Sequence, residues 1–261
     1  MTTGGSPGAS LETRESIAFL TIHGRSDLNL LGDQSFSALA DRIEQANNDQ
    51  QVRAIVLQGA GDRSFSAGVD LAEMKDLTPL QAEAFIRSLY RSTRGLLTSP
   101  LPAIAAVQGP CLGAALELAL ACDLRIATED ATFGLPEVRV GVPSVIQASL
   151  LAPTIGLGRA RALLLSGESV GAEEALRIGL VNKVVPNGRL EQAVLKSAQR
   201  FLGMSRYILS VQKDINAKWL EMGEEEGAEY SIKAFALCFA SGHPSEAMNA
   251  FLEKREPRFD G

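Results

Sequence analysis

The stretch that decides the fold reads Val107-Gln-Gly-Pro-Cys-Leu-Gly-Ala-Ala-Leu-Glu-Leu-Ala-Leu-Ala-Cys-Asp123. It begins at the end of an apolar run, Ala103-Ile-Ala-Ala-Val107, which is typical of a buried strand. Two glycines and a proline then indicate a tight loop, and the small apolar residues from Gly113 or Ala114 onward predict a helix. A strand that leads through a glycine loop into a helix is a building unit of an α/β fold.

The same alternation continues on both sides of this stretch. Hydrophobic periodicity predicts strands over 16–22, 54–57 and 124–127, and helices over 33–46 and 80–97. The last third of the chain is helix upon helix. We therefore expect a largely parallel sheet covered by helices, preceded by a flexible leader over 1–10. The α/β core should occupy 11–189, and a helical region over 190–261 should pack on a neighbouring subunit.

The composition excludes several classes of protein. The 261 residues are 46% hydrophobic and carry a net charge of −6, so the basic footprint of a nucleic-acid or anionic-membrane binder is missing. The longest uncharged stretch, Leu101 to Leu116, is interrupted by prolines and glycines, so we expect no membrane span. Two histidines and three cysteines without paired spacing indicate a reduced, metal-free protein of the cytoplasm.

Two loops are candidates for ligand binding. Ser64-Phe-Ser-Ala-Gly-Val-Asp70 follows a predicted strand, as the loop before Gly113 does, and open α/β sheets bind ligands at the carboxyl ends of strands. The first N–H groups of the second loop's helix have no acceptor within the helix. If the N–H of Ala67 converged with that of Ala114, the pair would form an oxyanion hole for an enolate. The alternative is that these glycines only permit tight turns and close packing.

Two glutamates are candidates for acid–base chemistry. Glu117 stands one turn into an otherwise apolar helix, where an ionised carboxylate is costly unless it is paired or used. Glu137 ends the apolar loop Phe133-Gly-Leu-Pro-Glu137. The alternative is that Arg125 or Arg139 pairs with these acids.

Taken together, these motifs resemble the signature of the enoyl-CoA hydratase/isomerase (crotonase) family. The likeness runs from about residue 12 to 259 and is strongest in the stretch Val107 to Asp123 and in Phe133-Gly-Leu-Pro-Glu-Val138. Supporting pieces are Ser66 to Asp70, Leu165-Ser-Gly-Glu, Ala172 to Val181 and Phe251-Leu-Glu-Lys-Arg255. The resemblance implies a ClpP/crotonase-like spiral of ββα units with a C-terminal helical trimerisation region, assembled as a homotrimer or a dimer of trimers.

The resemblance also implies a reaction, the hydration of a trans-2-enoyl-CoA to a 3-hydroxyacyl-CoA through an enolate. Glu117 and Glu137 match the two acids, and the N–H groups of Ala67 and Ala114 match the oxyanion hole. No separate cofactor is implied, because coenzyme A is part of the substrate. The implied substrate contacts are Arg25, Leu28, Ala67, Gly68, Val69, Asp70, Leu71, Gly113 and Ala114, with Phe251 and Lys254 supplied by the adjacent protomer.

The chain departs from the hydratase pattern in two places. Only Gly113 remains of a common run of three glycines, and Gly141-Val-Pro-Ser-Val-Ile-Gln147 replaces a glycine-rich stretch. These differences leave the acyl specificity open. They also leave three other readings: an enoyl-CoA isomerase with one base, a hydrolase of a CoA thioester or a β-diketone, and a non-catalytic scaffold. The presence of both Glu117 and Glu137 favours hydration.

Overall fold

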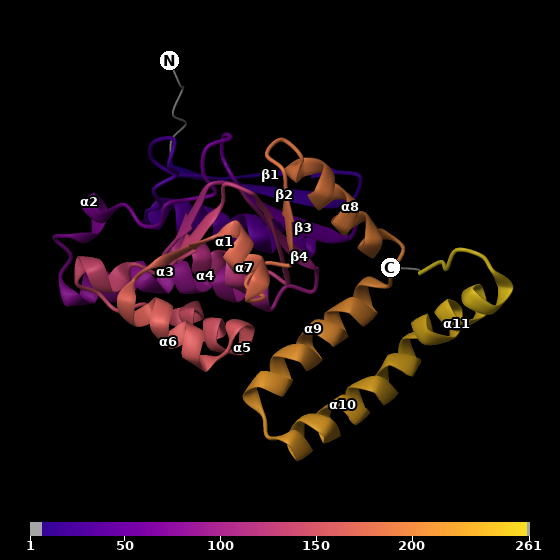
Figure 1. Ribbon diagram of the computed structural model, residues 1–261. Helices are drawn as coiled ribbons and strands as arrows, with labels where there is room; N and C mark the ends of the chain where they lie inside the picture. The colour runs from indigo at the N-terminus through magenta and orange to yellow at the C-terminus, as the bar shows by residue number, and fades with distance from the viewer. Residues whose placement is uncertain (1–6, 260–261) are drawn as a thin grey trace.

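The computed structural model of the protein describes residues 7–259. Figure 1 shows an α/β core from which the last helices extend as an arm. The strands are β1 (Gly8–Arg14), β2 (Ile17–His23), β3 (Ala54–Gly59), β4 (Ala103–Val107), β5 (Pro110–Leu112), β6 (Leu124–Thr128), β7 (Thr132–Gly134), β8 (Ser169–Gly171) and β9 (Lys183–Val185). The helices are α1 (Asp33–Asn48), α2 (Leu71–Met74), α3 (Pro79–Leu97), α4 (Ala114–Ala121), α5 (Leu151–Ile155), α6 (Leu157–Ser166), α7 (Ala172–Arg177), α8 (Leu190–Leu202), α9 (Arg206–Glu221), α10 (Glu224–Cys238) and α11 (His243–Glu253), with 3-10 turns η1 (Glu137–Val140), η2 (Ile146–Leu150) and η3 (Phe239–Ser241).

The strands form two sheets, and in each sheet the strands are arranged in the order in which they occur along the chain. The larger sheet has the order β1-β2-β3-β4-β6-β9, in which only β1 runs antiparallel to its neighbour. The smaller sheet has the order β5-β7-β8. β4 and β6 of the large sheet are each followed by a short strand of the small one, and β5 leads directly into α4. This strand–strand–helix repeat agrees with the α/β fold predicted from the sequence.

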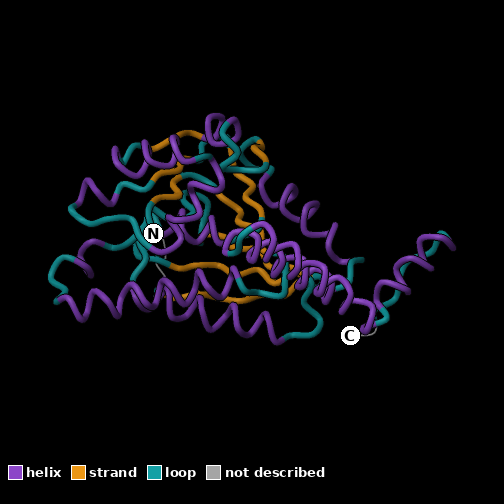
Figure 2. Tube along the Cα trace, turned by 90° about the horizontal axis from the view of Figure 1, so that it is seen from below, coloured by secondary structure: helices purple, strands orange, loops and turns teal. Residues whose placement is uncertain are grey.

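The large sheet is covered by helices on both faces, which explains its apolar strands. Successive residues of a strand point to opposite faces. Ala18 and Leu20 of β2 belong to a core shared with α1, α3 and α4, whereas Ile17 and Phe19 belong to a second core shared with α8. Figure 1 and Figure 2 show the strands enclosed between these helices. A sheet buried on both sides needs near-continuous hydrophobic strands.

The predicted C-terminal boundary of the flexible leader, residue 10, is wrong, because a strand begins at Gly8. Residues 1–6 lie outside the described part of the chain, but Gly8 to Ser10 belong to β1, which pairs with β2 from Gly8↔His23 to Arg14↔Ile17. Ala9 and Leu11 pack against the first core from the same face of β1. The strand forms because β2 would otherwise expose an unpaired edge.

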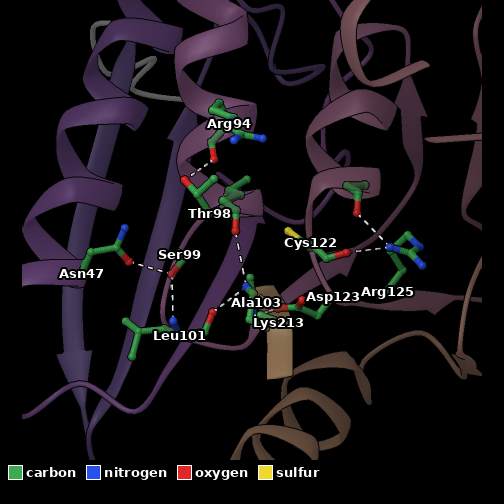
Figure 3. A network of polar contacts seen from close by, with 12 residues as sticks. Asn47, Arg94, Thr98, Ser99, Leu101, Ala103, Cys122, Asp123, Arg125 and Lys213 are labelled. Atoms are coloured by element: carbon green, nitrogen blue, oxygen red, sulfur yellow. Dashed lines mark hydrogen bonds and ion pairs between the residues drawn. The ribbon is translucent and has the colours of Figure 1, made fainter. Parts of the chain in front are cut away.

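The boundary expected at residue 190 is also corrected, because α8 covers the sheet and the arm begins at α9. Lys213 of α9 fastens the arm to the core, as Figure 3 shows. Its Nζ lies 2.7 Å from Oδ2 of Asp123 and donates to the carbonyl of Leu101 at 2.8 Å. The same carboxylate oxygen accepts the N–H of Ala103 at 2.7 Å. This network joins α9 to the end of α4 and the start of β4.

The arm exposes many large apolar side chains, which proteins normally bury away from water. They come from all three of its α-helices and include Trp219, Leu220, Ile232, Phe235, Leu237, Met248, Phe251 and Leu252. None of the helices within residues 7–259 has the length and hydropathy needed to cross a bilayer.

Candidate active site

The two predicted loops lie side by side at the carboxyl ends of β3 and β4. Ser66 donates its N–H to the carbonyl of Pro110 at 3.0 Å and accepts the N–H of Leu112 at 3.1 Å. Gly68 has a φ of +98°, and a Cβ built on it would lie 2.9 Å from the carbonyl oxygen of Leu112. Both the left-handed backbone and the close approach require glycine at this position. The contact brings the residues after Gly68 next to the start of α4.

Two backbone N–H groups are left without acceptors where these loops meet. Gly113 has a φ of +57° and donates its N–H to Gly134 at 2.9 Å, which turns the chain sharply into α4. Neither the N–H of Val69 nor that of Ala114 has a protein acceptor among residues 7–259. Ala114 is the first residue of α4, where the helix dipole adds partial positive charge. The site therefore offers two donors for one oxygen that carries negative charge.

The prediction that Ala67 supplies one of these donors is wrong. Its N–H donates to the carbonyl of Leu28 at 2.8 Å, because the loop closes onto the turn that follows β2. The N–H of Gly68 donates to Oγ of Ser66 at 3.0 Å. Among the described residues of this loop that line the cavity, Val69 is therefore the one whose N–H stays free. Ala67 and Gly68 still line the cavity described below.

Glu117 is buried inside the core and accepts two backbone hydrogen bonds. Its side chain projects from α4, its residue is 2% exposed, and Oε2 accepts the N–H of Gln147 at 2.7 Å and of Ala148 at 3.2 Å. Burial raises the pKa of Glu117 to about 8. The charge of Glu137 also raises this pKa, whereas the hydrogen bonds from Gln147 and Ala148 lower it. Glu117 therefore keeps its proton at neutral pH.

Glu137 lines the same cavity, at the start of η1. Its Oε2 accepts a hydrogen bond of 2.7 Å from the hydroxyl of Ser144. Its Oε1 faces Gly113, where a Cβ would lie only 2.9 Å away. A carboxylate oxygen thus lies beside the entry to α4, directly before the N–H of Ala114.

The alternative that the two acids pair with arginines does not apply. Arg125 is buried at the other end of α4 and donates to the carbonyls of Leu180, Ala119 and Cys122. Figure 3 shows its bonds to the last turn of this helix. Arg139 donates to the carbonyl of Ser166 at 2.9 Å. Each guanidinium satisfies backbone carbonyls, which leaves both carboxyl groups to the cavity.

The two acids and the two free N–H groups border one cavity of about 980 Å³. Glu117, Glu137, Val69 and Ala114 line it together. The remaining wall is mainly apolar and is built from α2, α3 and the segment 140–146. The described residues hold no group of three or more His, Cys, Asp or Glu side chains arranged to bind a metal. In such a pocket, the two acids can transfer protons to and from a bound molecule. The two backbone N–H groups can polarise its carbonyl group.

The other predicted substrate contacts fall into two groups. Asp70, Leu71 and Gly113 line the cavity, whereas Arg25 and Leu28 lie in the turn beside it. Asp70 also caps α2, because Oδ1 accepts the N–H of Ala72 at 3.0 Å. Arg25 pairs with Asp70 at 3.0 Å and with Glu73 at 3.7 Å. Its charge is thereby balanced within the chain, which does not favour the predicted contact of Arg25 with the substrate.

Phe251 and Lys254 are far from this cavity within one chain. Both belong to the arm, where Phe251 is 84% exposed and Lys254 ends α11. Figure 1 places α11 at the far end of the arm from α2 and α3. A single subunit therefore does not bring these two residues to the site.

The groups that hold the two acids were not predicted from the sequence. They are the hydroxyl of Ser144 and the N–H groups of Gln147 and Ala148. Gln147 is itself fixed to α3, because its Oε1 accepts the hydroxyl of Thr93 at 3.0 Å. The available signal was the polar Ser144 within the apolar run Val142-Pro-Ser-Val-Ile146, in the segment that departs from the hydratase pattern.

Comparison with known proteins gives a consistent result over nearly the whole chain. The family described as enoyl-CoA hydratase/isomerase matches residues 12–261. Crotonyl-CoA hydratase of Syntrophomonas wolfei is 36% identical over 250 residues, which cover 95% of this chain and 96% of that protein. Short-chain-enoyl-CoA hydratase of Clostridium acetobutylicum is 34% identical over 247 residues, 94% of this chain and 95% of that protein.

Solved structures agree with these relatives. An enoyl-CoA hydratase from Bacillus anthracis superimposes with a TM-score of 0.92 at 28% identity, covering 97% of this chain and 99% of that one. DspI of Pseudomonas aeruginosa superimposes with the same TM-score at 31% identity over the full length of both chains. The crotonase fold predicted from the sequence is confirmed by these neighbours.

Proposed function

The chain belongs to the enoyl-CoA hydratase/isomerase family, and on that premise we propose how its residues carry out the reaction. The protein is a hydro-lyase that adds water across the double bond of a trans-2-enoyl-CoA thioester. The water oxygen bonds to Cβ, a proton bonds to Cα, and the product is a 3-hydroxyacyl-CoA. The single observation that carries the assignment of residues is the pair of acids with unequal surroundings in one cavity.

Glu117 and Glu137 form the acid–base pair. Hydration needs one group that takes a proton from water as its oxygen attacks Cβ, and another that gives a proton to Cα. A pair that shares one proton meets both needs at once. The buried Glu117 retains that proton below a pKa of about 8, while the charge of Glu137 helps to raise it. An isomerase needs only one base for a proton shift, so two facing acids favour hydration.

The N–H groups of Val69 and Ala114 hold the thioester oxygen. Attack at Cβ moves charge onto this oxygen and creates an enolate, which two fixed donors stabilise more strongly than the neutral carbonyl. This proposal replaces Ala67 by Val69, because the N–H of Ala67 is bonded to Leu28. Gly68 and Gly113 allow the two donors to approach each other, and the N-terminus of α4 adds to the positive potential.

The arm of α9, α10 and α11 joins subunits. Its exposed side chains include Phe235 and Phe251, at 65% and 84%, which a neighbouring copy would remove from water. We propose a homotrimer or dimer of trimers in which Phe251 and Lys254 reach the CoA of the adjacent protomer. A reducing compartment, the cytoplasm, suits the three cysteines, which are buried and free.

A direct assay tests the function. Purified protein is incubated with crotonyl-CoA and with a longer trans-2-enoyl-CoA, and loss of the conjugated-thioester absorbance is followed while free CoA is titrated. Hydration predicts loss of absorbance without release of CoA, and mass spectrometry should find a gain of one water. Release of CoA would instead indicate a hydrolase. Conversion of a 3-enoyl-CoA to the conjugated isomer without hydration would indicate an isomerase.

A further inference from the structure

The active-site cavity extends well beyond the reacting groups, along α3. Thr93 of α3 bonds Gln147, whose N–H bonds Glu117, so this point of α3 lies beside the acids. The residues of α3 that line the cavity run from Tyr90 back to Ala82, away from that point. The cavity therefore follows the helix toward its N-terminus.

The length of this extension can be compared with an acyl chain. The eight steps from Tyr90 to Ala82 span about 12 Å at roughly 1.5 Å per residue. An extended chain advances about 3.5 Å over three bonds, so roughly ten carbons are needed to cover that distance. A crotonyl group has a single carbon beyond its double bond. It would leave the part of the cavity between Leu89 and Ala82 unfilled.

The wall along this path is suited to hydrocarbon. Met74, Leu77, Phe85, Ile86, Leu89 and Val145 line it. Phe85 and Leu89 are buried beneath the cavity, at 6% and 1% exposure, so their surfaces form a fixed floor. The charged side chains that α3 contributes, Glu83 and Arg87, are bonded to each other at 2.6 Å. Among the described α3 residues that line the cavity, no unpaired charge is therefore left to recognise a polar substituent on the acyl chain.

We propose that the preferred substrates are trans-2-enoyl-CoA thioesters with an alkyl tail of roughly ten carbons beyond the double bond, rather than crotonyl-CoA. The tail lies along α3 between Leu89 and Ala82. This inference rests on the proposed function only for the position of the thioester. Each added methylene that leaves water should raise affinity by about two- to fourfold until the cavity is filled.

The first experiment measures binding without catalysis. Dissociation constants of butyryl-, hexanoyl-, octanoyl- and decanoyl-CoA, which lack the reacting double bond, are determined by calorimetry. We expect decanoyl-CoA to bind at least about thirtyfold more tightly than butyryl-CoA. The kcat/KM values for the corresponding trans-2-enoyl-CoA thioesters should rise in the same order.

Two substitutions on α3 locate the tail. Ala82→Trp fills the distant end of the cavity. It should raise the dissociation constant of decanoyl-CoA by a factor at least ten times larger than that of butyryl-CoA. Ala82→Leu, a milder change, should act in the same direction with a smaller effect. Ala84→Trp is the matched control, because Ala84 is exposed and does not line the cavity. It should leave the affinities unchanged, and thermal unfolding should show that all variants fold.

The outcomes separate this inference from the proposed function. If butyryl- and decanoyl-CoA bind equally, or if Ala82→Trp weakens both to the same extent, the assignment of the tail to α3 is overturned even for an active hydratase. If affinity rises with chain length but no enoyl-CoA is hydrated, the inference stands and the proposed function fails.

Discussion

The hydroxyl of Ser144 donates a hydrogen bond of 2.7 Å to Oε2 of Glu137 and so fixes the orientation of this carboxyl group. The opposite oxygen, Oε1, is thereby directed toward Gly113 at the entry to α4. A hydrogen bond to a charged group contributes about 1.5–3 kcal/mol. Ser144 acts as a positioning residue, since it reaches the reaction only through Glu137.

Ser144→Ala should therefore lower kcat by about tenfold or more and change KM little, because the lost bond orients the acid rather than the substrate. Ser144→Thr, which keeps a hydroxyl, should recover part of the rate. Ser149→Ala is the control, because the hydroxyl of Ser149 donates to the carbonyl of Ile146 at an exposed site. Steady-state kinetics measure the effects on kcat and on KM separately. A rise in KM with kcat unchanged would contradict the positioning role.

Glu117→Gln and Glu137→Gln should each lower kcat by at least about a hundredfold, because each removes one proton-transfer group while preserving its shape. Single-turnover measurements with a trans-2-enoyl-CoA would show whether the chemical step is affected. Glu44→Gln, at an exposed position of α1 outside the cavity, serves as the control. Near-full turnover by either site variant would mean that its acid does not carry the reaction.

The buried Glu117 should also make stability depend on pH. The folded protein keeps this proton up to a pKa of about 8, whereas an unfolded glutamate releases it near 4.5. The folded state therefore binds more protons between these values, and its free energy of unfolding falls as pH rises, by at most about 1.4 kcal/mol per pH unit. This contribution is complete below about pH 4.5 and is lost by about pH 8.

Glu117→Gln lacks this titration, so its stability relative to the original protein should improve as pH rises from about 5 to 8. Urea unfolding at several pH values measures the difference. Glu12→Gln, at an exposed position, should show no such gain. Parallel stability curves for Glu117→Gln and the original protein would argue against a protonated, buried glutamate.

The oxyanion hole can be tested by removing one of its backbone donors. Ala114→Pro deletes the N–H at the first residue of α4, where a helix tolerates proline. The loss of one such donor typically lowers the rate by about a hundred- to a thousandfold. Ala172→Pro makes the same change at the first residue of α7, outside the cavity, and should remain active. A folded Ala114→Pro protein with unchanged kcat would show that the thioester oxygen is held elsewhere.

The arm should govern assembly. Phe235→Asp and Phe251→Asp place a charge on apolar surface that is 65% and 84% exposed in the single chain, and both should yield smaller assemblies. Leu80→Asp, at an equally exposed apolar position on α3, is the control. Light scattering reports the mass, and a fully active monomer of the original protein would exclude a contribution of Lys254 from a neighbouring subunit.

The sequence by itself determined the α/β class, the positions of most strands along the chain and the two acids. Continuous apolar runs such as Ala103 to Val107 and the helical periodicity of α1 and α3 are local signals, which the folded chain retains. Glu117 and Glu137 stood out because isolated acids in apolar segments are costly unless they are used. Glycines at the ends of strands likewise marked the loops of the site.

Only the tertiary structure decided which atoms of those loops are free. The choice between the N–H of Ala67 and that of Val69 depends on the carbonyl of Leu28, which comes from a turn distant in the sequence. The pKa of Glu117 depends on burial and on the approach of Gln147 and Ala148. In the same way, β1 is a strand because β2 offers it an unpaired edge, and α8 belongs to the core because the sheet needs a second cover. Such pairings are made between segments far apart in the chain, so no local pattern specifies them.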